Sequence, residues 1–178
     1  MKALVYIQPN EVIYREETDP VPGEGEVLVR VDAVGICGSD LHAYLGHDER
    51  RIAPLILGHE AAGVIVGSSM NGQKVVINPL VTCGHCKACL LGRSNLCADR
   101  EIVSMAPRQG AFAEFLSIPV SNLVPVPEGM DMAKAALAEP IATGWHAVTM
   151  AAKAAHRPLA ENRALVYGGG AVGMAAAL

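Results

Sequence analysis

The sequence predicts a mainly β, barrel-like domain followed by the beginning of an α/β domain. Three observations carry this prediction. Roughly the first 130 residues contain short apolar or alternating runs broken by many Pro and Gly residues, which is typical of short strands joined by tight turns. A cysteine-rich stretch interrupts these runs. Beyond it the chain becomes Ala-rich and helical, and a run of glycines lies near its end.

Side-chain periodicity indicates where the strands lie. Val27, Val29 and Val31 occupy alternate positions, which is the pattern of a half-buried strand. Residues 61–67 and 75–78 are further runs rich in β-forming residues. Turn residues separate these segments, so we expect consecutive strands to pair with one another.

The C-terminal segment has a different pattern. Residues 131–137 are Ala-rich, and Pro140 fits the first turn of a longer helix, where its missing N–H group has no cost. Residues 164–167 (Ala-Leu-Val-Tyr) are a candidate buried strand, and residues 168–173 supply the glycine run. An Ala-rich helix is expected to follow.

These patterns divide the chain into two domains. Residues 1–138 are expected to form the β domain, with a lobe at about residues 80–105 that contains most of the cysteines. Residues 139–178 are expected to begin a dinucleotide-binding domain that is incomplete, because such a domain needs two βαβαβ halves.

Composition excludes several classes of partner. The 178 residues are 51% hydrophobic and 18% charged, with a net charge of -4, which is typical of a folded globular protein. The sequence has no cluster of Lys and Arg, so nucleic acid is not an expected partner. No apolar run reaches the roughly 18 residues that span a membrane. The N-terminal apolar run is too short for a signal peptide, and five cysteines are an odd number, so we expect reduced thiols and a cytoplasmic protein.

Four of the cysteines predict a structural zinc site. Cys83, Cys86, Cys89 and Cys97 follow the spacing C-x2-C-x2-C-x7-C, and four thiolates can surround one zinc ion tetrahedrally. The alternative is a chance cluster of free or buried thiols. His85 lies between two of them, but four thiolates already complete the coordination, so it is expected to be a loop residue.

The fifth cysteine predicts a second site of another kind. Cys37 and His59 with Glu60 offer sulfur, nitrogen and oxygen ligands, a mixed set typical of catalytic zinc with one open position. Asp40 is placed to accept a hydrogen bond from the second ring nitrogen of His59. Taken singly, each residue could be an ordinary buried or hydrogen-bonded side chain, and only their combination indicates a site.

A hydroxyl and an imidazole lie close to this set in sequence. A zinc-bound alcohol must lose a proton, and Ser39 and His42 could carry that proton to water. Together with Asp40, they are the candidate catalytic residues.

The glycine run matches a dinucleotide-binding fingerprint. Gly168, Gly170 and Gly173 fit the spacing G-x-G-x-x-G between a strand and a helix, and Val172 lies in the same turn. These four residues are the candidate cofactor-binding residues. A glycine-rich turn into a helix without a ligand is the alternative.

The order of these motifs resembles the zinc-dependent medium-chain dehydrogenase/reductase family, within the alcohol dehydrogenase superfamily. The motifs, in chain order, are residues 35–42 (GICGSDLH), 58–63 (GHEAAG), the four lobe cysteines, 110–115 (GAFAEF), Glu139-Pro140 and 168–173 (GGGAVG). The resemblance implies a GroES-like barrel domain that holds a catalytic zinc, followed by a Rossmann domain. Members of the family are about twice as long, so the chain resembles an N-terminal half.

The resemblance also assigns the metal ligands. Cys37 and His59 would bind the catalytic zinc, and either Glu60 or Glu139 would be the third ligand. Many alcohol dehydrogenases of the family use a cysteine there, but every cysteine of this chain is already assigned. Glu139-Pro140-Ile141 is instead similar to the polyol and sugar-alcohol branch.

The implied activity is hydride transfer between an alcohol and NAD or NADP. The resemblance implies two zinc ions per chain, a small-molecule substrate such as a polyol, a sugar alcohol or its phosphate, and a homo-oligomer (dimer or tetramer) at full length. Ser39 and His42 would form the proton relay. The alternative is a non-catalytic, truncated zinc-binding module of the GroES-like type.

Overall fold

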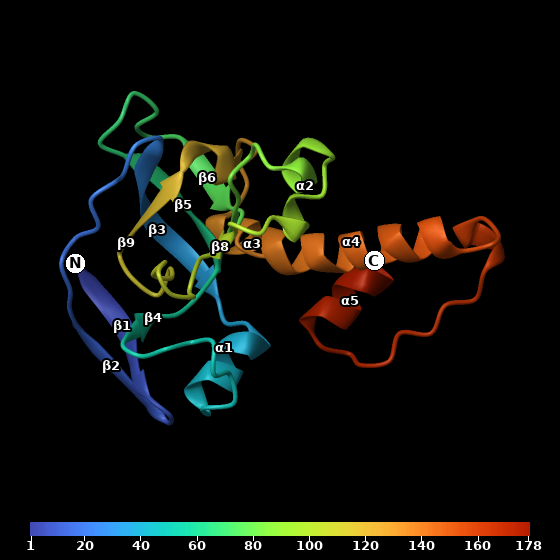
Figure 1. The fold of residues 1–178 in the computed structure, drawn as a ribbon, viewed down its shortest axis with the longest axis horizontal. Coiled ribbons are helices and arrows are strands. Elements are labelled where there is room, and N and C mark those ends of the chain that lie inside the picture. The colour runs from blue at the N-terminus through green and yellow to red at the C-terminus, as the bar shows by residue number, and fades with distance from the viewer. The chain divides into compact units, whose positions relative to one another are not determined.

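A computed structural model describes all 178 residues, which divide into two units, Met1–Ala136 and Leu137–Leu178 (Figure 1). The first unit is built mainly from strands and the second from helices. The first unit is therefore the mainly β domain that the sequence predicts, and the second unit contains helices and no strand. The boundaries drawn from sequence at residues 138 and 139 stay a prediction.

A five-stranded antiparallel sheet is the centre of the first unit. Its strands occur in the order β10-β6-β5-β3-β9. Their bounds are Glu26–Gly35 (β3), Glu60–Val66 (β5), Lys74–Ile77 (β6), Phe115–Pro119 (β9) and Leu123–Pro125 (β10). The periodicities at residues 27–31, 61–67 and 75–78 thus correspond to β3, β5 and β6.

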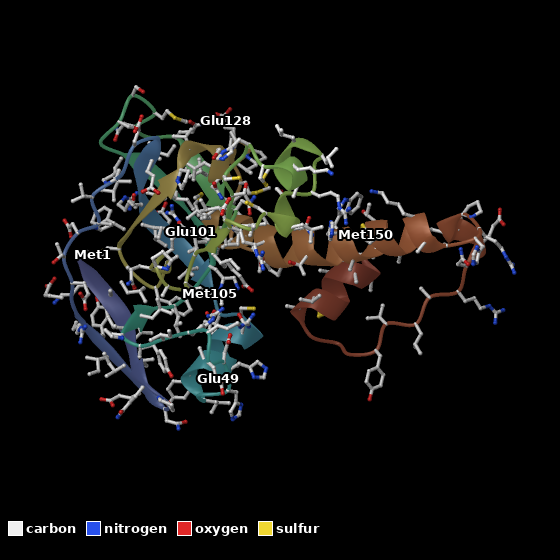
Figure 2. The ribbon with its side chains drawn as sticks, viewed as in Figure 1. Met1, Glu49, Glu101, Met105, Glu128 and Met150 are labelled. Atoms are coloured by element: carbon white, nitrogen blue, oxygen red, sulfur yellow. The ribbon has the colours of Figure 1, made fainter.

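The alternating residues of this sheet form the main hydrophobic core. Val29, Ile65, Val75 and Ile118 come from four different strands, and each is at most 1% exposed. They pack in one cluster because residues at alternate positions of a strand point to the same face. Charged side chains such as Glu49 and Glu128 lie on the surface of this unit (Figure 2).

A smaller sheet contains the N-terminus. It has the order β2-β1-β4, with β1 at Lys2–Gln8, β2 at Glu11–Glu16 and β4 at Leu55–Ile56. Asn10 has a φ of 65° in the turn between β1 and β2, a conformation that Asn tolerates better than most residues. A backbone bond from the Leu4 N–H to the Phe112 carbonyl, at 2.8 Å, joins β1 to the segment before β9.

Short helices and strands complete the first unit. The helix α1 (Gly38–Tyr44) directly follows β3, and α3 (Met132–Ala135) begins at Asp131, whose carboxylate accepts a hydrogen bond from the Lys134 N–H at 3.0 Å. The cysteine lobe contains β7 (Leu80–Val81), α2 (Lys87–Leu90), η1 (Ser94–Leu96) and β8 (Glu101–Ile102), and η2 (Val120–Asn122) precedes β10. Pairing of β7 with β8 joins the two ends of the lobe.

The second unit contains α4 (Ala138–Ala154), η3 (Leu159–Glu161) and α5 (Ala171–Ala177). Pro140 lies in the first turn of α4, as expected. A Cβ atom at Gly144 would lie 2.7 Å from the Ala175 backbone, so the glycine allows α4 and α5 to pack closely. No helix of the chain combines the length and the apolar character that crossing a bilayer requires.

The strand predicted at residues 164–167 is wrong for this structure. The segment has no regular secondary structure, and Leu165 and Tyr167 are 90% and 99% exposed. A strand must pair its backbone N–H and C=O groups with a neighbouring strand, and the second unit contains no strand. Residues 164–167 therefore have no sheet with which to pair.

Candidate functional site

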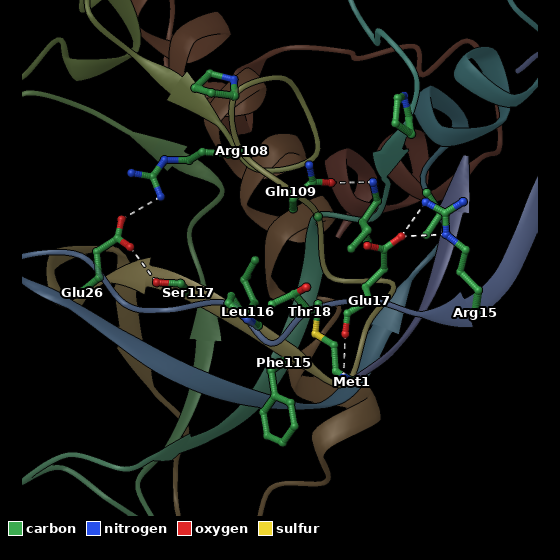
Figure 3. A pocket seen from close by; sticks show the side chains of 16 residues that line it. Met1, Arg15, Glu17, Thr18, Glu26, Arg108, Gln109, Phe115, Leu116 and Ser117 are labelled. Atoms are coloured by element: carbon green, nitrogen blue, oxygen red, sulfur yellow. Dashed lines mark hydrogen bonds and ion pairs between the residues drawn. The ribbon is translucent and has the colours of Figure 1, made fainter. Parts of the chain in front are cut away.

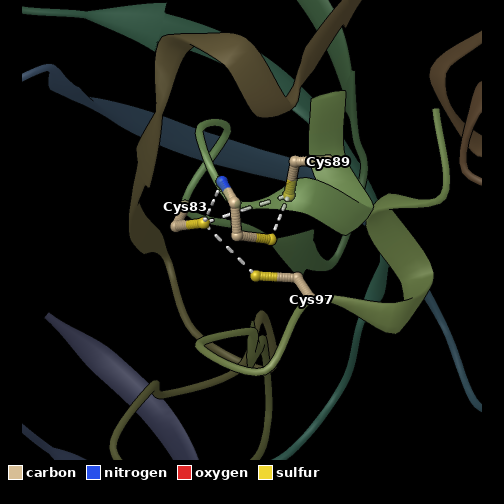
Figure 4. Close-up of side chains that lie close together, drawn as sticks. Cys83, Cys89 and Cys97 are labelled. Atoms are coloured by element: carbon tan, nitrogen blue, oxygen red, sulfur yellow. Dashed lines mark hydrogen bonds between the residues drawn. The ribbon is translucent and has the colours of Figure 1, made fainter. Parts of the chain in front are cut away.

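The four cysteines of the lobe lie close together, as Figure 4 shows. The sulfur atoms of Cys83 and Cys97 are 3.5 Å apart, those of Cys86 and Cys89 are 3.5 Å apart, and those of Cys83 and Cys89 are 4.0 Å apart. Four sulfurs around one zinc at 2.3 Å would be separated by roughly 3.8 Å. The separations are too long for disulfides, and all five cysteines are free. The lobe thus fits a tetrahedral zinc ion.

Local structure brings these thiols together. Cys86 lies at the N-terminus of α2 and Cys89 lies within it, so their three-residue spacing places them on one side of the helix. Cys97 follows η1 and is fully buried. Asn122 fixes the strand that enters the lobe, because its side-chain amide donates to the Asn78 and Leu80 carbonyls at 2.8 Å each.

The thiols of the lobe differ in acidity. Hydrogen bonds from the Cys89 backbone N–H and then from its thiol lower the pKa of Cys86 to about 7. Burial, followed by the hydrogen bond with Cys86, raises the pKa of Cys89 to about 11. Zinc binds thiolates, so binding near neutral pH must displace protons from the lobe. We therefore expect zinc affinity to rise with pH across the neutral range.

Cys37, His59 and Glu60 also form a cluster. One ligand atom from each of the three residues lies within 4.8 Å of the other two. Antiparallel pairing of β3 with β5 places Gly35 opposite Glu60 and so brings together segments far apart in sequence. His59 and Glu60 are 9% and 7% exposed, while Cys37 is half-buried. The result is a largely buried cluster of mixed ligands.

Two glycines make room for this cluster. A Cβ atom at Gly35 would collide with the Glu60 carboxylate. Gly58 precedes His59, has a φ of +88°, and would bring a Cβ atom to 2.6 Å from the Phe112 ring. Glycine is required at Gly58 because the position needs a positive φ and has no room for a Cβ atom. This residue therefore fixes the direction in which the chain enters β5.

Replacing Gly35 by Ala is expected to displace the Glu60 side chain. Overpacking of this kind costs about 1–3 kcal/mol, and it should weaken zinc binding at the Cys37 cluster without affecting the lobe. Zinc content and thermal unfolding of Gly35→Ala measure both effects. Gly23→Ala is the matched control, because a Cβ there makes only ordinary contacts at 3.7 Å or more. Equal zinc content in the two variants would contradict the role given to Glu60.

Asp40 organises the start of α1. It is 3% exposed, and it accepts hydrogen bonds from the Cys37 N–H at 3.0 Å and the Gly58 N–H at 3.2 Å. Burial alone would raise the pKa of Asp40, but interactions with His59, the Cys37 N–H and Arg51 outweigh burial and hold it below the ordinary value. Asp40 is therefore ionised at neutral pH, and its contribution to stability is lost only as the pH falls below that ordinary value.

The hydrogen bond predicted between Asp40 and His59 is absent. His59 Nδ1 lies 3.6 Å from Asp40 Oδ1, beyond hydrogen-bond distance, and Nδ1 has no hydrogen-bond partner. Asp40 instead directs Oδ1 to Arg51, whose Nη1 donates to it at 2.8 Å. Sequence reasoning missed Arg51, which is only 7% exposed. Nothing in its local sequence distinguishes it from the neighbouring exposed Arg50.

Ser39 and His42 lie on α1. Ser39 is half-buried and accepts a hydrogen bond from Arg51 Nη2 at 3.0 Å. His42 is exposed three residues later, on the same side of the helix, with its ring 6.1 Å from the ring of His47. Their roles in a proton relay stay predictions.

The glycine loop has part of the expected geometry. Gly168 has a φ of +109°, Gly170 caps the N-terminus of α5, and a Cβ atom at Gly173 would collide with the Gly168 carbonyl. Val172 is 46% exposed at the same turn. Cofactor binding by these residues stays a prediction. So does zinc binding by Glu139, which lies in the first turn of α4 in the second unit.

A separate cavity of about 370 Å³ in the first unit contains none of these residues (Figure 3). Its charged side chains are already paired: Arg108 Nη1 donates to Glu26 at 2.8 Å, and the Ser117 hydroxyl donates to the same carboxylate at 2.6 Å. The two metal-ligand clusters are therefore the candidate functional sites.

Comparison with known proteins shows the family to which the β domain belongs. Residues 23–128 match the family model of the alcohol dehydrogenase GroES-like domain. The chain is 39% identical to L-galactonate-5-dehydrogenase of Escherichia coli K12 over 99% of its length, and 43% identical to sorbitol dehydrogenase of Bacillus subtilis over 83%.

Solved structures have the same fold. The RspB alcohol dehydrogenase of E. coli CFT073, complexed with NADH, has a TM-score of 0.87 at 34% identity, covering 98% of this chain and 51% of that one. Galactitol-1-phosphate dehydrogenase of E. coli has a TM-score of 0.87 at 30% identity, covering 99% and 51%. The chain spans about half the length of the relatives it matches, 52% for L-galactonate-5-dehydrogenase and 44% for sorbitol dehydrogenase. It belongs to the zinc-dependent alcohol dehydrogenase family, the medium-chain dehydrogenases/reductases.

Proposed function

We propose that this chain supplies the zinc sites of an NAD(P)-dependent dehydrogenase that oxidises a polyol, a sugar alcohol or its phosphate. The convergence of Cys37, His59 and Glu60 within 4.8 Å carries the proposal. Relatives named as L-galactonate-5-dehydrogenase, sorbitol dehydrogenase and galactitol-1-phosphate dehydrogenase support the substrate class.

The three side chains fit a catalytic zinc. One thiolate, one imidazole and one carboxylate leave a fourth tetrahedral position open for substrate. His59 Nδ1 faces Asp40, which leaves Nε2 for the metal. The position of Glu60 in the cluster supports it as the third ligand, and Glu139 is the alternative. When bound, the zinc ion supplies Lewis-acid stabilisation of negative charge on the substrate oxygen.

The chain's own residues then move the proton. Ser39 Oγ accepts the proton of the substrate hydroxyl and gives up its own toward His42, which is exposed to solvent. When bound, NAD(P) would accept the hydrogen of the carbinol carbon as hydride on its nicotinamide ring. The loop at residues 168–173 would bind the pyrophosphate that links the two halves of the dinucleotide. The balance is alcohol plus oxidised cofactor to carbonyl compound, reduced cofactor and one proton.

The four-cysteine lobe has a different role in this proposal. Its four thiolates leave no open position, so the zinc they bind would stabilise the fold and take no part in turnover. The proposal therefore includes two zinc ions per chain with separate functions. It also includes a homo-oligomer, which sedimentation of the complete protein would test.

Turnover tests the proposal directly. Zinc-loaded protein with a complete dinucleotide-binding domain should reduce NAD or NADP in the presence of at least one member of a panel of hexitols, pentitols, aldonates and their phosphates. The initial rate at 340 nm is the measurement. If no alcohol is oxidised with either cofactor, the alternative of a non-catalytic zinc-binding module is favoured.

A further inference from the structure

We infer that Arg51 is a positioning residue that holds the Ser39 hydroxyl in the orientation needed for proton transfer, an inference that rests on the proposed function. Arg51 lies in the loop between α1 and β4. Its Nη2 donates to Ser39 Oγ at 3.0 Å, while its Nη1 donates to Asp40 Oδ1 at 2.8 Å. One guanidinium thus joins the hydroxyl of the proposed relay to the buried carboxylate that faces His59.

Buried partners hold the guanidinium. Its side chain is 5% exposed, and a buried charge of this kind persists only when it is paired. Asp40 is the hydrogen-bonded partner of Nη1, while Nε has no hydrogen-bond partner and lies 3.6 Å from the Asp48 carboxylate. Because the five N–H groups of arginine lie in one plane, the bond from Nη1 to Asp40 limits the directions in which Nη2 can point toward Ser39.

This contact leaves Ser39 only the bonds that a relay needs. A hydroxyl has one hydrogen to donate and two lone pairs to accept with, and Arg51 occupies one lone pair. A guanidinium has no lone pair to offer, so the serine hydrogen must point elsewhere. The second lone pair can take the proton of the substrate hydroxyl while the serine O–H donates onward to the next acceptor.

The charge of Arg51 assists the same step. Ser39 gains the substrate proton and loses its own, so it is a neutral hydroxyl before and after the transfer. Any negative charge that develops on Oγ during the transfer lies 3.0 Å from the Arg51 guanidinium. Asp40 neutralises part of the positive charge of Arg51, but Nη2 donates to Ser39 and not to the carboxylate. The effect is thus directed at the relay oxygen.

Arg50 is a matched control on the same loop. It is bidentate to Asp48, with Nε at 2.7 Å from Oδ1 and Nη2 at 2.9 Å from Oδ2. Its side chain is 73% exposed and forms its hydrogen bonds with Asp48, not with Ser39 or Asp40. Arg50→Gln therefore removes an arginine and its ion pair with Asp48 from the loop, while the bonds from Arg51 to Ser39 and Asp40 remain available.

The experiment compares Arg51→Lys, Arg51→Gln, Arg50→Gln, Ser39→Ala and the double variant Ser39→Ala/Arg51→Lys in the protein with a complete dinucleotide-binding domain. We expect Arg51→Lys to keep both zinc ions, to lower kcat by about 10- to 100-fold with a change in KM of less than about threefold, and to increase the solvent isotope effect on kcat. Arg50→Gln should retain the kcat of the unchanged protein. The double variant should be no slower than Ser39→Ala, because Arg51 acts through Ser39.

Three results would overturn the inference. The first is a kcat for Arg51→Lys equal to that of Arg50→Gln, and the second is a double variant whose losses multiply. The third is loss of zinc or of folding in both Arg51 variants, which would give Arg51 a structural role alone. Absence of turnover by the unchanged protein would overturn the proposed function, and this inference with it.

Discussion

Replacing Cys97 by Ser is expected to remove the lobe zinc and unfold the segment that contains α2 and η1. Cys97 is fully buried, and its sulfur lies 3.5 Å from that of Cys83. Structural zinc contributes roughly 10–16 kcal/mol of apparent binding energy in small domains, and the lobe has few other interactions to keep it ordered. Leu90, Leu91 and Leu96 are each more than 50% exposed, so no hydrophobic core replaces the metal.

Hydrogen exchange and zinc content measure this effect. Amides of residues 83–97 should lose protection in Cys97→Ser, and zinc content should fall by about one ion per chain. His85→Ala is the matched control, because His85 is an exposed neighbour whose ring Nδ1 lies 2.8 Å from the Cys83 carbonyl and which is not one of the four thiol ligands. Unchanged protection of the lobe in metal-free Cys97→Ser would contradict the structural role of the zinc.

The second large effect is expected at Cys37. Cys37→Ala removes the thiolate but keeps the backbone N–H that donates to Asp40 at 3.0 Å, so the start of α1 should be preserved. Loss of the catalytic zinc removes several kcal/mol of charge stabilisation, which corresponds to a fall in kcat/KM of about 1000-fold or more. Zinc in the cysteine lobe should remain.

The steady-state rate with the best alcohol of the panel measures this loss. Ile36→Ala is the matched control, since Ile36 is adjacent in sequence and 72% exposed. A Cys37→Ala protein that retains more than about a tenth of the activity would show that Cys37 is not a ligand of a catalytic metal.

The sequence predicted correctly those features that follow from the local repeat of a strand or a helix. The alternation at Val27, Val29 and Val31 follows from the two-residue repeat of a strand, and β3 has the same register. The spacing of Cys86 and Cys89 follows from one turn of helix, and the two sulfurs meet at 3.5 Å. The cluster of Cys37 with His59 required more, since only the pairing of β3 with β5 brings them together.

The errors and omissions concern partners distant in the chain. The segment at residues 164–167 has the composition of a strand but no neighbouring strand to pair with. Arg51 is buried because Asp40 and Ser39 lie beside it, and neither contact leaves a signal in the loop sequence. The same arginine takes the Asp40 oxygen that was expected to bond His59, which leaves that pair 3.6 Å apart.

We propose that one chain holds two zinc ions in two independent sites. Elemental analysis of zinc per chain in the unchanged protein, Cys97→Ser and Cys37→Ala measures this stoichiometry. We expect about two ions in the unchanged protein and about one in each variant, with the lobe ordered only in Cys37→Ala. A single zinc in the unchanged protein, or loss of both ions in either variant, would contradict it.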